Sequence, residues 1–158
     1  MKKILVLFVF CSIGMITKAQ DYRNAIGIRG GFSSGITFKH LKSNNRGFEG
    51  ILSWHPSGFT ITGLYEVHKA AAFGTPRLNW YYGGGAHIGF YNDRPRYYRY
   101  YPDYPNRTFV AMGADGIIGI EYNIREIPLN FSFDLIPRLN LLYPAFWVDP
   151  GLSIRLYF

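Results

Sequence analysis

The feature that most constrains this chain is an alternation of apolar and polar side chains that recurs in one short segment after another. Between residues 128 and 136, for example, Leu129, Phe131, Phe133 and Leu135 alternate with Asn130, Ser132 and Asp134. Successive side chains of a strand point to opposite faces, so this period of two indicates strands with one apolar and one polar face. No window of eleven residues shows the 3.6-residue period of a helix. The alternation therefore predicts an all-β protein with very little helix.

Clusters of Gly, Pro, Asn and Ser divide the alternating part into pieces of strand length. Strands are predicted at 25–32, 34–41, 47–55, 58–68, 78–91, 108–123, 128–136 and 150–158. The stretch 25–41 fits either two strands or one bent strand. The predicted connectors include Pro137 to Asp149. Consecutive strands of this kind form an antiparallel up-and-down sheet, which closes into a barrel of eight strands.

Alternation is compatible with two opposite barrels, because the apolar face can line the interior or face lipid. Charged residues make up 17% of the chain, which is low against about 25% for soluble domains. Large aromatic residues also gather near the strand ends, as they do at the two interfaces of a bilayer. These two features favour a transmembrane β-barrel. We expect Ile88, Ile118, Phe131 and Ile154 to point outward, not to meet in a common centre.

A closed barrel suits this setting because lipid offers no hydrogen-bond partner to an open sheet edge. Strands of 9–11 residues are long enough to cross a bilayer when tilted. Eight strands enclose a space that side chains fill, whereas an aqueous channel needs about 16. We therefore predict a lumen filled by side chains that is not a channel.

The N-terminus has the pattern of a secretory signal peptide. Met1-Lys2-Lys3 is basic, Ile4 to Ile16 is apolar, and Thr17-Lys18-Ala19 resembles a cleavage site. We predict that residues 1–19 are removed and that residues 20–158 form a single barrel domain. The only cysteine, Cys11, lies in the removed segment. Disulfides, thiolate metal sites and cysteine catalysis are thereby excluded from the mature chain.

Several of these features together resemble the small eight-stranded outer-membrane β-barrels, of the outer membrane protein X and outer membrane protein A transmembrane-domain type. The resemblance rests on the signal peptide, the glycine-rich strands, the opening Ile26-Gly27-Ile28-Arg29-Gly30-Gly31-Phe32 and the terminal Arg155-Leu156-Tyr157-Phe158. The resemblance covers nearly all of the mature chain. It implies the cell outer membrane of a Gram-negative envelope as the location and the barrel-assembly machinery as a partner during biogenesis. That fold hosts many activities, so the resemblance implies little about activity.

Charged residues on the predicted polar faces would lie inside such a barrel. They are Arg29, Lys39, Glu49, Glu66, Asp115, Glu121, Asp134 and Arg155. Buried charges must pair, so we interpret them as an ion-pair network that fills the lumen. A proton path or acid–base catalysis is the alternative interpretation. His55, His68 and His87 share the polar faces, but His55 is expected near one rim and His68 near the other, so the three are not expected to converge on a metal.

The connector 92–107 has a composition unlike the rest of the chain. Its candidate contact residues for the cell exterior are Arg94, Arg96, Tyr97, Tyr98, Arg99, Tyr100, Tyr101 and Tyr104. Tyr and Arg supply adaptable contacts to proteins, glycans or the phosphates of lipopolysaccharide. A loop of a barrel whose loops are free to vary is the other interpretation.

The sequence thus predicts a monomeric barrel of the outer membrane with a structural or surface-interaction role. Outer-membrane lipid and lipopolysaccharide are its expected partners, and no catalysis, cofactor, metal or nucleic acid is expected. Two alternatives remain. One is a lipid hydrolase or acyltransferase in which His55 pairs with Ser53 or Ser57, and the other is a soluble periplasmic carrier with the opposite face inside.

Overall fold

The structure is a computed structural model that describes residues 24–42, 44–75, 77–92, 109–124 and 126–158. Eight strands account for most of these residues. They are β1 (Asn24–Gly31), β2 (Ser34–Lys42), β3 (Arg46–His55), β4 (Gly58–Lys69), β5 (Leu78–Tyr91), β6 (Phe109–Ile124), β7 (Leu129–Asn140) and β8 (Ala145–Tyr157). A short 3-10 turn, η1 (Ala72–Gly74), precedes β5. Within the described ranges no helix is long and apolar enough to cross a membrane.

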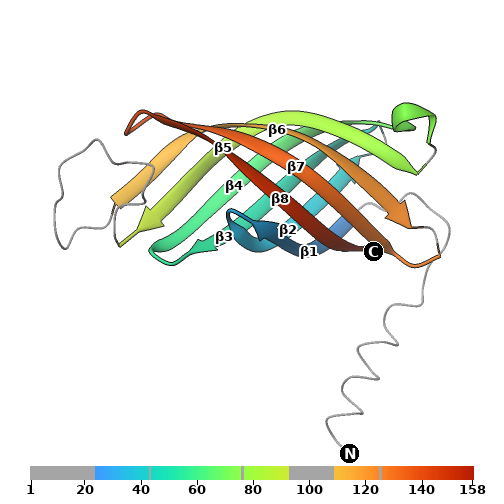
Figure 1. Ribbon diagram of the computed structural model, residues 1–158, viewed down its shortest axis with the longest axis horizontal. Helices are drawn as coiled ribbons and strands as arrows, with labels where there is room; N and C mark the ends of the chain where they lie inside the picture. Colours follow the sequence, from blue (N-terminus) through green and yellow to red (C-terminus); the bar gives the residue numbers. More distant parts are fainter. Residues whose placement is uncertain (1–23, 43, 76, 93–108, 125) are drawn as a thin grey trace, which may run out of the picture.

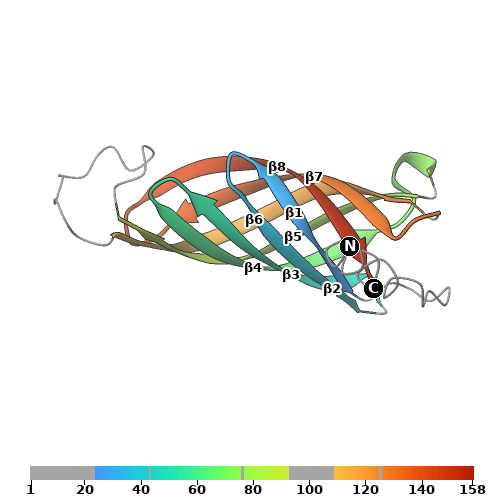
Figure 2. The same ribbon diagram turned by 90° about the horizontal axis from the view of Figure 1, so that it is seen from below.

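The strands form a single closed barrel in which each strand pairs antiparallel with its neighbours in the sequence (Figures 1 and 2). Closure comes from β1 and β8, which pair from Ala25↔Tyr157 to Gly31↔Gly151. Asn24 and Phe158 exchange two backbone hydrogen bonds, so the two ends of the described chain lie together. The fold class predicted from the alternation, an all-β up-and-down barrel of eight antiparallel strands, is confirmed. Residues 25–41 form two strands, not one.

The two faces of the wall differ sharply in polarity. Ile118, Phe131 and Ile154 are 51%, 41% and 44% exposed on the outside, whereas Glu66 and Arg155 are 0% and 1% exposed inside. Ile118, Phe131 and Ile154 therefore do not meet in a common centre. The barrel buries many charged residues inside and exposes many of its large apolar residues outside.

The last hairpin differs from the prediction. The segment from Pro137 to Asp149, expected to be a loop, is mostly wall: β7 continues to Asn140 and β8 begins at Ala145. Pro137 is tolerated because Ile136 and Pro137 have no ladder partners on β6, so the missing N–H removes no hydrogen bond there. Pro137 and Pro150 lie within β7 and β8, and neither proline ends its strand.

The wall is shorter at the β1–β2 hairpin than at the neighbouring hairpins, and we call this place the low point of the wall. β1 ends at Gly31, opposite Gly151, while β8 starts six residues earlier at Ala145 and pairs there with β7 alone. The β1–β2 hairpin therefore stops short of the neighbouring hairpins, as Figure 2 shows. This low point forms one side of the rim pocket described below.

Candidate functional site

The structure places all eight charged residues predicted for the lumen inside the barrel, where each is buried. They fall into two groups with additional partners. We call the group nearer the chain termini the terminal-end network; it consists of Lys39, Glu49, Glu66, His68, Glu121 and Arg155. The second group, the loop-end network, consists of Arg29, His87, Asp115, Asp134, Arg138 and Asp149.

Short contacts hold the terminal-end network together. Lys39 Nζ lies 2.8 Å from Glu66 Oε2 and 3.2 Å from Glu49 Oε2. Arg155 donates to Glu49, and its Nη1 also donates to Ser132 Oγ at 2.6 Å. Thr37 adds a further hydrogen bond to Glu49. Charge-assisted bonds of this kind offset the large cost of removing ions from water.

His68 has a carboxylate at each ring nitrogen. Its Nε2 lies 3.0 Å from Glu66 Oε2 and its Nδ1 lies 3.1 Å from Glu121 Oε1. A neutral imidazole has one N–H, so both contacts are hydrogen bonds when the ring carries two protons or when one of the facing carboxyls is itself protonated. Either form adds one proton to a network in which Lys39 and Arg155 face three carboxylates.

The loop-end network has the same kinds of residues in a looser arrangement. Arg29 Nη2 lies 2.7 Å from Asp134 Oδ1, and Arg29 Nη1 lies 3.4 Å from Asp149 Oδ2. Arg138 lies 3.3 Å from Asp149 and 3.5 Å from Asp115. His87 Nδ1 lies 2.7 Å from Asp115 Oδ1, while its Nε2 has no hydrogen-bond partner. Three of these five distances are 3.3 Å or longer, whereas one of the six ion-pair distances in the terminal-end network is, that from Lys39 to Glu121 at 3.8 Å.

Tyr81 touches both networks. Its hydroxyl donates to Asp134 Oδ2 at 3.3 Å. The Tyr81 ring lies 4.1 Å from Lys39 Nζ and stacks on His68 with 5.1 Å between ring centroids. The ring fits because the neighbouring wall residue is Gly119, where a Cβ would lie 2.6 Å from Tyr81 Cζ. A second close approach occurs at Gly151, where a Cβ would overlap the Arg29 guanidinium.

An apolar cluster occupies another part of the lumen. Ile51, Leu64, Ile117 and Ile136 pack with Tyr81 and are at most 4% exposed. Alternation places these aliphatic residues on the inner face, although none of them was predicted to lie in the lumen. The cluster and the two networks together account for most of the large buried side chains of the barrel.

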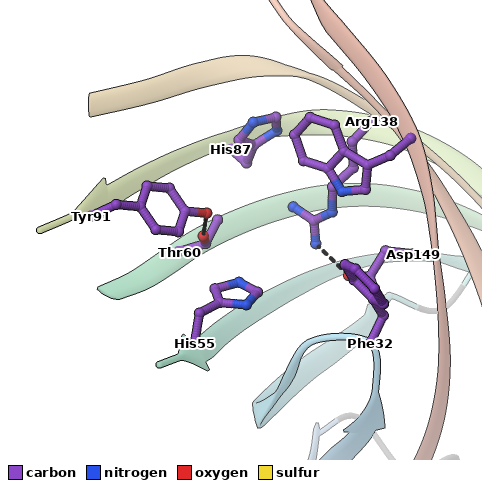
Figure 3. Close-up of a pocket in the computed structure, with 8 residues that line it drawn as sticks. Phe32, His55, Thr60, His87, Tyr91, Arg138 and Asp149 are labelled. Atoms are coloured by element: carbon purple, nitrogen blue, oxygen red, sulfur yellow. Dashed lines mark hydrogen bonds and ion pairs between the residues drawn. The ribbon is translucent and has the colours of Figure 1, made fainter. Parts of the chain in front are cut away.

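The rim pocket lies at the loop end of the barrel, beside the low point of the wall. His55, Thr60, His87, Tyr91, Arg138 and Asp149 line it, with Phe32 and Trp147 (Figure 3). Its volume of about 10 Å³ holds a single water molecule. As expected, His55 and His68 lie at opposite ends of the barrel, but His55 and His87 line the same pocket, which was not predicted. Sequence reasoning missed this because the long diagonal from β3 to β5 depends on strand register.

The described residues contain no group of three or more His, Cys, Asp or Glu side chains that could hold a metal ion. The hypothetical His55–Ser53 pair is not formed, since the Ser53 hydroxyl is buried without a hydrogen-bond partner. Instead, the histidine with a carboxylate partner at this end is His87, which contacts Asp115.

Two members of the loop-end network, Arg138 and Asp149, were absent from the sequence prediction. Both lie in the stretch that Pro137 and Pro150 made look like a loop. The alternation Arg138, Leu139, Asn140 and then Val148, Asp149 was the signal that could have revealed them. The Tyr/Arg-rich segment with Arg94, Tyr97 and their neighbours, and the predicted signal peptide, lie outside the described residues.

The geometry defines a closed antiparallel eight-stranded barrel with buried charged side chains on its inner face. No family model matches the chain, and no curated protein matches it. Among solved structures, it is similar to the crystal structure of the N-terminal beta-barrel domain of Pseudomonas aeruginosa OprF. The TM-score is 0.64 with 14% sequence identity, over 88% of this chain and all of that domain. At this identity the likeness shows the fold alone, a small closed barrel of eight antiparallel strands.

Proposed function

We propose that the protein is an integral outer-membrane β-barrel that spans the bilayer as a monomer and does not conduct. The observation that carries the proposal is the inverted polarity of the wall, with buried charges inside and large apolar side chains exposed outside. In water this exterior would be an apolar patch far larger than soluble monomers expose. In lipid the same exterior is the favourable one.

Aromatic side chains at the strand ends support the same orientation. Trp80, Tyr122 and Phe131 lie near the chain termini, while Trp54 and Phe59 lie near the opposite rim, and all are partly exposed. Rings at these two levels match the two interfaces of a bilayer. Outer-membrane barrels have short periplasmic turns and longer extracellular loops. Because the longest connector, 92–108, joins β5 to β6 at the loop end, we assign the terminal end to the periplasm and the rim pocket to the cell exterior.

The filled lumen supports a role without conduction or catalysis. Ion pairs and the apolar cluster take up the interior, and the rim pocket has room for one water. The role that remains is structural, or a surface interaction through Arg94, Arg96, Arg99 and the tyrosines between residues 97 and 104. Lipopolysaccharide phosphate is the expected ligand class for that segment, since Arg forms bidentate bonds to phosphate.

Cell fractionation tests the proposal directly. The full chain, expressed in a Gram-negative host, should remain in the envelope after osmotic shock and high salt. It should migrate differently on gels with and without heating, because closed barrels resist unfolding by detergent. Release in the osmotic-shock fraction would identify the soluble carrier instead. Discrete current steps in planar bilayers would contradict the non-conducting lumen.

Removal of residues 94–106 tests the surface role separately. Barrel folding should be unaffected, while binding of lipopolysaccharide to cells or vesicles carrying the protein should fall. Unchanged binding would assign the protein a structural role alone.

A further inference from the structure

The outer surface of the barrel is not uniformly convex. A groove of about 330 Å³ crosses β6, β7 and β8 near the terminal end. Its walls are almost entirely apolar and include Leu78, Ile120, Tyr122, Phe131, Leu152 and Ile154. The volume is comparable with that of one lipid acyl chain, so the groove is large enough to seat a tail.

A basic residue lies at the end of this groove. Arg77 immediately precedes Leu78, whose partner on β6 is Tyr122, and the Arg77 carbonyl accepts a hydrogen bond from Asn123 N at 3.1 Å, so Arg77 lies beside two residues of the groove wall. Arg77 Nη1 also lies 3.3 Å from Glu126 Oε1, in an ion pair whose members are 38% and 66% exposed. A guanidinium has five N–H donors, so these contacts leave donors for a phosphate.

The terminal end as a whole carries positive charge. Lys42, Arg46 and Lys69 stand at strand ends there and are exposed. Among the described residues of this rim, one exposed carboxylate, that of Glu126, stands against these three basic residues and Arg77. Basic residues at the level of the headgroups attract anionic lipid. An apolar groove that ends at an exposed Arg therefore matches an amphiphile with a tail and an anionic head.

We propose that this groove is a binding site for one anionic phospholipid of the periplasmic leaflet, with an acyl chain along β6–β8 and its phosphate at Arg77. The inference rests on the proposed function, because it requires the terminal end to lie at the periplasmic interface. It adds a specific lipid partner to a surface that otherwise contacts lipid without preference.

The chain offers matched controls for the headgroup and for the tail. Arg46 is an exposed basic residue at the same end, but it lies on β3, opposite β7 in the closed barrel. Leu52, also on β3, faces outward like Leu152 of the groove. Arg77→Gln and Leu152→Trp alter the proposed site, whereas Arg46→Gln and Leu52→Trp make the same changes on the opposite wall.

The experiment is native mass spectrometry of the barrel in phosphocholine micelles titrated with phosphatidylglycerol. Retention of one phosphatidylglycerol per barrel is expected. Arg77→Gln should weaken it about fivefold, and Leu152→Trp should reduce it by filling the groove, while the two control variants should match the wild type. The heat-dependent gel shift shows that each variant is folded.

Three results would overturn the inference. Equal losses in Arg77→Gln and Arg46→Gln would mean diffuse attraction to a basic rim. A dimer that Leu152→Trp dissociates would mean that a second copy occupies the groove. A folded, vesicle-inserted barrel that retains no lipid would remove the site and leave the proposed function intact, whereas a protein that does not insert at all would remove the proposed function.

Discussion

The two charged networks of the lumen have the same composition and differ in how closely they are tied. Each contains two strong bases, three carboxylates and one histidine. In the terminal-end network, His68 has a carboxylate at both ring nitrogens, and the Lys39–Glu66 distance is 2.8 Å. In the loop-end network, His87 has one carboxylate, and both Arg138 contacts to carboxylates are 3.3 Å or longer.

The difference follows the position of each network in the barrel. The terminal-end network is enclosed by wall on every side, since β1 and β8 pair without interruption down to Tyr157. The loop-end network lies under the rim pocket and the low point of the wall, where a water molecule fits. We infer that the first network stabilises the barrel, and that the second is more tolerant of change because water can replace lost partners.

The largest expected effect is that of Arg155→Gln. The change leaves Glu49 without its guanidinium partner and the terminal-end network with one strong base against three carboxylates. Breaking a buried ion pair from one side costs about 3–5 kcal/mol. Denaturant unfolding in vesicles, followed by tryptophan fluorescence, measures the loss. A cost no greater than that of an exposed ion pair would mean that water reaches this part of the lumen.

Arg138→Gln is expected to cost less, about 2 kcal/mol, close to the loss of hydrogen bonds to charged groups. Asp149 keeps Arg29 and Ser33 as partners, and Asp115 keeps His87. The same unfolding assay compares the two arginine variants. If Arg138→Gln proved as costly as Arg155→Gln, the contrast between the two networks would be lost.

The histidines give a finer comparison. His68→Gln removes a ring that contacts two carboxylates, whereas His87→Gln removes a partner of one. We expect His68→Gln to lower the free energy of unfolding by about 1 kcal/mol more than His87→Gln. Double variants with Glu121→Gln separate the charge from the hydrogen bond, because an amide at position 121 keeps a hydrogen-bonding group without the carboxylate charge. A larger loss of unfolding free energy in His87→Gln than in His68→Gln would contradict the inference that the terminal-end network contributes more to stability.

The smallest effect is expected at the barrel exterior. Arg77→Gln breaks an exposed ion pair with Glu126, and such pairs contribute little to stability. The midpoint of unfolding should not move measurably, even where lipid retention falls. A clear loss of stability would mean that Arg77 anchors the β6–β7 turn, not a lipid.

Sequence alone predicted the faces of the wall well, and contacts across the lumen poorly. A period of two decides which side of a strand each residue occupies, so Arg29 and Asp134 were both assigned to the interior. Their 2.7 Å ion pair joins β1 to β7, past β8, and depends on the stagger that accumulates around the closed barrel. No local pattern encodes that stagger.

The same reasoning explains the omissions. Arg138 and Asp149 were hidden by the neighbouring prolines, of which Pro137 sits where the ladder needs no N–H. The aliphatic residues of the lumen face inward although they are apolar; they are Ile51, Leu64, Ile117 and Ile136. A strand pattern read for charge alone cannot find them, because the lumen is packed by volume as well as by charge.

The central claim is that the apolar face of the wall contacts lipid. Nitroxide labels placed on single cysteines at Ile118 and Ile154 of the vesicle-inserted barrel, with Phe73 in the exposed η1 turn as a control, test it most directly. The account predicts that oxygen dissolved in the bilayer relaxes the first two labels strongly, while a water-soluble nickel reagent relaxes only the label at Phe73. Equal relaxation of all three labels by the nickel reagent would place that face in water and contradict the account.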